Sequence, residues 1–183
     1  MRLQGRRGSH RRSVPLAAIL GLAMALTAAP TILAARPVVT VTHPTAPIPY
    51  PAGEACAFDI RAQPTNTTVV TTTFSNGTVV AAITSDPRLT NLATGASIVT
   101  HSRFVKVETF DAATNSVTDV VVGRFNANFF PGDQGPYGVV SAPGLFLSFV
   151  GEVKATSDAD SGAVTRFSLH GRVTANICAE LST

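Results

Sequence analysis

From Cys56 to the C-terminus, apolar and polar residues alternate with a period of two, and this pattern is the strongest constraint on the fold. Cys56, Phe58 and Ile60 alternate with small or polar neighbours, as in a strand that buries one face. Turn signals rich in Gly, Pro, Asn and Asp separate such runs, and none of the runs has a helical period. The pattern predicts an all-β domain of about 8–10 strands.

The clearest predicted element is a β-hairpin over residues 67–84. Both halves are rich in Thr and Val, which suit a pleated surface, and Asn76-Gly77 stands between them. Asn-Gly favours a type I′ turn, in which both residues have positive φ. Further strands are expected over residues 117–130, 145–156 and 164–179, the first of them bending at Gly123.

Two cysteines, Cys56 and Cys178, lie at opposite ends of the predicted domain. In an exported chain they are expected to form a disulfide, with two free thiols as the alternative. Neither belongs to a Cys-x-x-Cys pair or adjoins a histidine, so no metal site is predicted.

The expected bridge bears on the architecture, because it would join the first strand of the domain to the last. Those two strands are neighbours in an up-and-down barrel, so we expect a single antiparallel β-barrel. A β-sandwich, which can also bring its ends together, is the alternative.

Residues 1–35 read as a signal peptide. Five arginines and no acid precede an apolar run that ends in small residues. A membrane tether formed by an uncleaved N-terminal segment is the alternative. Without this segment the chain has nine basic and eleven acidic residues, a net charge of −2. No basic run remains, so we expect no nucleic-acid partner. Cleavage removes the apolar run with the signal, so we expect no stable membrane insertion afterwards.

Two regions follow the signal. Residues 36–54 contain five prolines and read as an extended linker, and residues 55–183 form the antiparallel β domain. The domain is expected to be a monomer.

Three patterns suggest chemistry, and each has a simpler explanation. Ser168 and His170 share one face of a strand, as the nucleophile and base of a hydrolase could, yet a period of two places any such neighbours together. Asp158, Asp160 and Gly162 resemble the start of a calcium loop but lack its later ligands. Paired strand carboxylates, as in glycoside hydrolases, could come from Asp59, Glu108, Asp119 and Glu152, but acids within strands need not converge, and the chain has no Trp to form the aromatic platform of a sugar site. We expect no catalytic residue, metal or cofactor.

The segment 131–144 is the candidate binding loop. It combines prolines and glycines with Asp133, Gln134 and Tyr137, between two apolar strands. Tyr137 offers an apolar ring with a polar tip, so these three residues are the predicted partner-binding set. A rigid Ω-loop without a partner is the alternative.

Several strings in the chain carry a resemblance: FFPGD at 129–133, GLF at 144–146, SLHGRV at 168–173 and TNLATG at 90–95. With them, most of residues 55–181 resembles small secreted actinobacterial β-domain proteins of unknown function. The resemblance implies a compartment and a fold type, and it supplies no functional residues.

These observations predict an exported, non-enzymatic binding or structural module that works at or outside the cell surface, with an extracellular or cell-surface partner of unknown identity. A β-barrel carrier of a small apolar ligand is one alternative. A hydrolase using Ser168 and His170 is the other.

Overall fold

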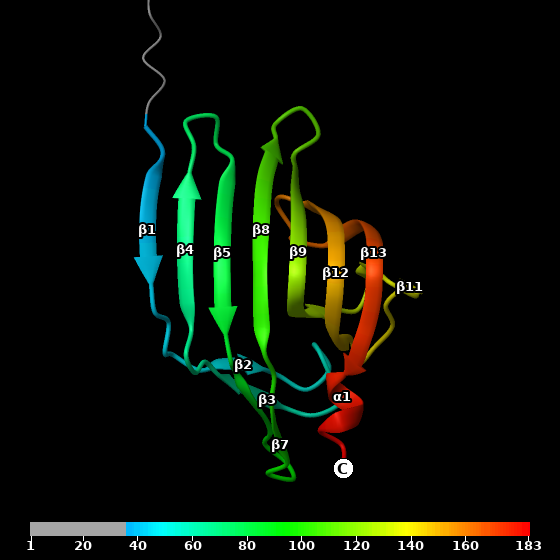
Figure 1. The fold of residues 1–183 in the computed structure, drawn as a ribbon. Coiled ribbons are helices and arrows are strands. Elements are labelled where there is room, and N and C mark those ends of the chain that lie inside the picture. Colours follow the sequence, from blue (N-terminus) through cyan, green and yellow to red (C-terminus); the bar gives the residue numbers. More distant parts are fainter. Residues whose placement is uncertain (1–35) are drawn as a thin grey trace, which may run out of the picture. The chain divides into compact units, whose positions relative to one another are not determined.

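The computed structural model describes residues 36–183, and the predicted signal peptide lies outside them. A seven-stranded antiparallel sheet forms most of this part (Figure 1). In spatial order its strands are β1 (Val38–Thr42), β4 (Thr68–Thr73), β5 (Val79–Ser85), β8 (Ser102–Asp111), β9 (Ser116–Phe129), β12 (Leu145–Asp158) and β13 (Val164–Asn176).

A second antiparallel sheet has four short strands. They are β2 (Ile48–Tyr50), β3 (Ile60–Gln63), β6 (Arg88–Asn91) and β7 (Ser97–Val99). The chain crosses repeatedly between the two sheets. In Figure 1 the small sheet lies below the ends of β4, β5 and β8. A two-stranded hairpin, β10 (Gln134–Gly135) with β11 (Gly138–Val139), and the helix α1 (Ile177–Glu180) complete the fold.

The all-β prediction is confirmed, but the barrel prediction is wrong. β1 and β13 are the two edges of the large sheet and do not pair with each other, so the arrangement is open and sandwich-like. The argument for closure took Cys56 and Cys178 to lie in neighbouring strands. Cys56 instead lies in the turns before β3, and Cys178 lies in α1.

The proline-rich segment 36–54 was expected to be a linker, and the structure places two strands in it. β1 pairs with β4 and β2 pairs with β3, so each adds an edge strand to one sheet. An edge strand needs ladder hydrogen bonds on one side only, which makes the neighbouring prolines tolerable.

The predicted hairpin forms from β4 and β5, with a different turn. Phe74 N donates to Thr78 O (2.9 Å) and Gly77 N donates to Phe74 O (3.0 Å), which closes a three-residue loop. Gly77 has φ +83°, whereas Asn76 is not among the positive-φ residues of the described chain. Three-residue hairpin loops need a left-handed residue at this one position, so the type I′ prediction was wrong.

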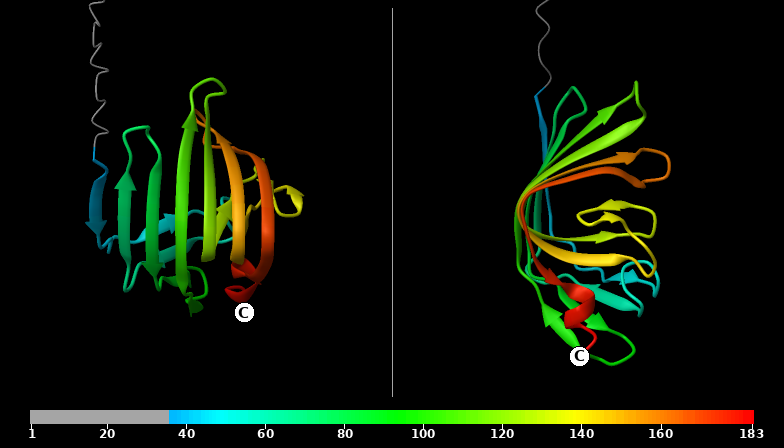
Figure 2. Two further views of the ribbon diagram at one scale, coloured as in Figure 1. Left: turned by 45° about the horizontal axis from the view of Figure 1, so that its top comes forward. Right: turned by 90° about the vertical axis from the view of Figure 1, so that its right-hand side faces the viewer.

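A row of glycines crosses three strands of the large sheet. Gly151 of β12 pairs with Gly123 of β9 on one side and Gly171 of β13 on the other. Gly123 and Gly151 have φ of +136° and +130°, and a Cβ on either would collide with the backbone of the adjacent strand. Strand glycines of this kind allow sharp curvature, and the sheet bends strongly in the right-hand view of Figure 2.

Two apolar clusters use opposite faces of β12. Leu147 and Phe149 belong to an aromatic cluster with Phe125 and Phe129 of β9, which Val140 also joins. The hairpin β10–β11 lies within the curve of the sheet, on the side of this cluster (Figure 2). Phe146, the neighbour of Leu147 in sequence, packs instead with residues of the small sheet and of α1. The alternation of side chains along one strand therefore supplies both clusters.

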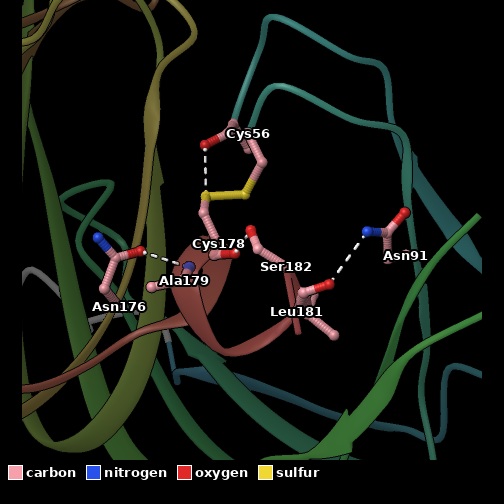
Figure 3. The surroundings of a disulfide bond; sticks show 8 residues. Cys56, Asn91, Asn176, Cys178, Ala179, Leu181 and Ser182 are labelled. Carbon is pink, nitrogen blue, oxygen red and sulfur yellow. Dashed lines mark hydrogen bonds between the residues drawn. A yellow bond between two sulfur atoms is a disulfide. The ribbon is translucent and has the colours of Figure 1, made fainter. Parts of the chain in front are cut away.

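The predicted disulfide between Cys56 and Cys178 is present, with a Cα–Cα distance of 5.5 Å (Figure 3). The side chain of Asn176 caps α1 by accepting from Ala179 N at 3.2 Å. The buried amide of Asn91 donates to Leu181 O at 3.0 Å. These contacts fix the C-terminal helix against β6 and the turns before β3.

Within residues 36–183, none of the helical structure reaches the length and apolarity that a transmembrane helix requires.

Candidate functional site

A pocket of about 460 Å³ lies between the two sheets. Four strands of the large sheet and three of the small sheet contribute side chains to it. The lining residues are Ile83, Ser85, Ser102, Phe104, Asn126, Asn128 and Phe146 from the large sheet, Ile48, Tyr50, Ala62 and Leu89 from the small sheet, and Pro44, Ala46, Pro64, Thr67 and Pro87 from the connections. This volume is in the range of small-molecule sites.

Prolines mark the connections that form the rim. Pro44 lies between β1 and β2, Pro64 between β3 and β4, and Pro87 between β5 and β6, so each of these crossings between the sheets has one. Proline cannot donate a ladder hydrogen bond, and it therefore suits the points where the chain leaves one sheet for the other. The same residues place rigid apolar rings at the edge of the pocket.

No lining residue is Lys, Arg, His, Asp or Glu. The phenol of Tyr50 is half-buried, and burial raises its pKa above the ordinary value. Its ring packs against that of Phe146, with centroids 5.4 Å apart. A charged ligand would have no counter-ion among these side chains and would lose hydration on entry. The pocket therefore favours an uncharged, largely apolar molecule.

Two asparagines of β9 and the hydroxyl groups of Thr67, Ser85 and Ser102 are the polar part of the lining. Asn126 is held in place because its Nδ2 donates to Thr100 Oγ1 (2.6 Å) and its Oδ1 accepts from Ser148 Oγ (2.7 Å). Asn128, two residues further along, is half-buried and makes no side-chain hydrogen bond within residues 36–183. An amide with free donors and an acceptor can orient a neutral polar group of a ligand.

The predicted loop residues have different environments. Asp133 is buried, and its two carboxylate oxygens accept from Phe130 N (2.7 Å) and Val164 N (2.8 Å), so it joins the loop to the start of β13. Gln134 begins β10 and is half-buried. Tyr137 lies at the tip of the β10–β11 hairpin with 74% of its surface exposed. Of the three, only Tyr137 is freely presented to solvent.

The hydrolase alternative gains no support. Ser168 and His170 are both exposed on β13, and no hydrogen bond joins them in the described chain. His170 Nδ1 lies 3.9 Å from Glu152 Oε1, which is an ion-pair distance and too long for a hydrogen bond. A nucleophile and base in contact, with an orienting acid, are therefore not assembled here.

The remaining sequence patterns have structural explanations. Asp158 Oδ1 accepts from Ser161 N at 2.8 Å and from Asp160 N at 3.2 Å, so it organises the β12–β13 turn. Within residues 36–183, no group of His, Cys, Asp and Glu is arranged to hold a metal ion. Glu108 and Asp119 do lie opposite each other on β8 and β9, and the ammonium of Lys106 lies 2.9 Å and 3.1 Å from their oxygens.

Sequence reasoning missed the pocket. Its lining comes from positions between 44 and 146, and four of these sixteen residues, at positions 44, 46, 48 and 50, belong to the segment 36–54 that reads as a linker. The one local signal was the placement of Pro44, Pro64 and Pro87 between strands, which marks connections without showing that they converge.

Fold and site together define a disulfide-linked, all-β domain of two open antiparallel sheets with an apolar pocket between them. No protein-family model, no curated protein and no solved structure matches this chain.

Proposed function

We propose that residues 36–183 form an exported, non-enzymatic module that binds a small, uncharged, mostly apolar ligand in the pocket between the sheets. The observation that carries the proposal is the lining, in which aliphatic and aromatic side chains surround a space of about 460 Å³ and no residue is charged. The disulfide supports export, because such bonds persist in oxidising compartments.

The ligand has an apolar body and a neutral hydrogen-bonding group. The body lies among Ile83, Leu89 and Phe146, while the polar group meets the free amide of Asn128. An alcohol should therefore bind better than a carboxylate of the same chain length, because the carboxylate would be buried without a partner.

Fluorescence titration with the uncharged probe N-phenyl-1-naphthylamine tests the proposal. The probe should gain emission on binding, and 1-decanol should displace it at least tenfold more effectively than decanoate at pH 8. Ala62→Leu, which extends a buried side chain of β3 into the pocket, should weaken probe binding at least tenfold.

Two further variants distinguish a loss of probe binding caused by filling the pocket from a loss caused by a disturbed fold. Ala46→Leu narrows the pocket from an exposed position, so it does not depend on repacking the core. Ala82→Leu makes the same change at an exposed position of β5 that does not line the pocket, and it should bind the probe like the parent. Equal probe binding by all four proteins would refute the proposal.

A further inference from the structure

The large sheet has a second face, opposite the aromatic cluster, which we call the outer face. On β9, β12 and β13 it comprises the exposed or half-exposed residues 118, 120, 122 and 124, 150, 152, 154 and 156, and 166, 168, 170 and 172. The strand register is unbroken across these positions. Their side chains therefore lie on one side of the sheet. In the right-hand view of Figure 2 this is the convex side.

Strand pairing gathers cations on the outer face that are dispersed in the sequence. Arg124 and Arg172 both flank Val150, which places them two strand spacings apart, about 10 Å. Lys154 pairs with Ser168, and Arg166 is the diagonal neighbour of Lys154. All four cations are exposed, and none forms an ion pair within residues 36–183. Glu152, near His170, is the single carboxylate among the outer-face positions.

One end of this face is hollowed. Lys154 and Arg166 line a depression of about 470 Å³, together with the hydroxyl groups of Thr118, Thr156 and Ser168. The one carboxylate in its lining, Asp111, already accepts hydrogen bonds from Ala113 N and Thr114 Oγ1, both at 2.9 Å. Two cations among hydroxyl donors provide the groups that bind an oxyanion.

The arrangement suits an extended partner. Arg166 and Arg172 are six residues apart on β13, about 20 Å along the strand, and they lie on the convex side of the bend at Gly171, so one small anion cannot contact both. No aromatic residue occupies an outer-face position. Phe167 also lines the hollow, but its ring packs in the aromatic cluster against Phe129, so it offers no platform for stacking a nucleic-acid base. Val122 and Val150 are shorter than the cations beside them, so the face has no apolar group that projects far enough to enter a bilayer.

We propose that the outer face binds a linear anionic polymer, which runs along β12 and β13. One anionic group occupies the hollow at Lys154 and Arg166, and later groups along the chain contact Arg124 and Arg172. Residues 36–183 carry a net charge of −2, so the whole domain does not attract polyanions and the binding depends on this local array. The proposal is independent of the pocket.

Titration of the full-length protein with dextran sulfate tests this surface, with neutral dextran as the blank. Lys154→Gln/Arg166→Gln should weaken binding at least tenfold in low salt, and Arg124→Gln/Arg172→Gln should weaken it at least threefold. Affinity should fall steeply as salt rises. The matched control is Arg61→Gln/Arg88→Gln, which removes the same charge from exposed positions of the small sheet and should change binding less than twofold.

Each other result overturns the proposal. Absence of dextran sulfate binding in low salt, or equal loss in the control and the Lys154/Arg166 variant, would show that the array is not a site. An unchanged affinity of the Lys154/Arg166 variant would show that the polymer binds elsewhere on the chain, for example to the arginines of residues 1–35. Tighter binding to phosphatidylglycerol vesicles than to dextran sulfate, lost in the same variants, would make the partner a membrane surface.

Discussion

At the scale of single residues, Asp86 is the best-defined electrostatic feature. It lies where the chain leaves β5 for β6, beside Pro87 at the rim of the pocket. Its Oδ1 accepts from His101 Nδ1 at 3.0 Å and from Arg103 Nη1 at 3.1 Å. The hydrogen bond from His101, followed by the one from Arg103, lowers the pKa of Asp86 to about 2. This carboxylate therefore joins the β5–β6 crossing to the start of β8.

The lowered pKa predicts how stability depends on pH. An acid whose pKa is lower in the folded state stabilises the fold above its unfolded value, 3.8, and loses this contribution as pH falls towards about 2. Asp86→Asn should therefore be less stable than the parent at pH 7, with a difference that shrinks between pH 4 and pH 2. Urea unfolding across this range measures it. Glu54→Gln, which neutralises an exposed carboxylate, is the control for the removal of a charge. If the parent and Asp86→Asn still differ in the free energy of unfolding at pH 2, the account is contradicted.

At the scale of elements, the glycine row determines the curvature of the large sheet. Gly123, Gly151 and Gly171 lie side by side on three strands, where a side chain would meet the neighbouring backbone. The bend turns the aromatic faces of β9, β12 and β13 inward, so residues on one sheet pack against each other without a full second layer. The ring centroids of Phe129 and Phe167, for example, are 5.3 Å apart.

Gly151→Ala should be strongly destabilising. An alanine Cβ would lie 2.7 Å from Gly171 Cα, at a φ of +130° that L-residues rarely adopt. We expect a loss of about 3 kcal/mol in the free energy of unfolding. Gly162→Ala is the matched control, since Gly162 also has positive φ (+72°) but a Cβ there meets nothing within 4 Å. It should cost about 1 kcal/mol, and equal losses in the two variants would exclude a steric role for the glycine row.

Local patterns predicted the elements well and the arrangement less well. The β4–β5 hairpin and the long strands β9, β12 and β13 were expected from β-branched runs and turn residues, and the bend at Gly123 was expected from the glycine itself. The turn type and the edge strand β1 were missed. A proline-rich sequence does not distinguish a linker from an edge strand, because both are extended.

At the scale of the whole domain, one covalent link joins the small-sheet end to the C-terminus. Cys56 is almost completely buried and lies in the same cluster as Ile177 and Leu181. The bridge spans 122 residues of sequence, so it constrains most of the described chain when unfolded. It also holds α1 against the cluster that contains Phe146, a wall of the pocket.

Replacing both Cys56 and Cys178 with serine should lower the free energy of unfolding by about 4 kcal/mol, on the chain-entropy account of a loop this long. Urea unfolding of the oxidised parent and the double variant measures the difference. The parent treated with a reductant is the control, and it should unfold close to the double variant. An unchanged midpoint in the double variant would show that the bridge contributes nothing to stability.

The candidate pocket could not have been predicted from the sequence, and the reason is geometric. Its lining residues are brought together by several crossings between two sheets, and a period of two in each strand reveals neither the order of strands nor their partners. The cations of the outer face illustrate the same limit, because Arg124 and Arg172 are 48 positions apart in the sequence and become neighbours only through the register of β12.

The pocket is the central claim, and the most direct test is an amide and side-chain NMR titration with 1-decanol. We predict that the largest shift changes fall on Asn126, Asn128 and Ile83, with small changes at Tyr137 and none at Arg172. The Ala62→Leu variant should abolish these changes. Shift changes concentrated around Tyr137 would place binding at the loop 131–144, and the absence of any saturable change would leave the space between the sheets without a ligand.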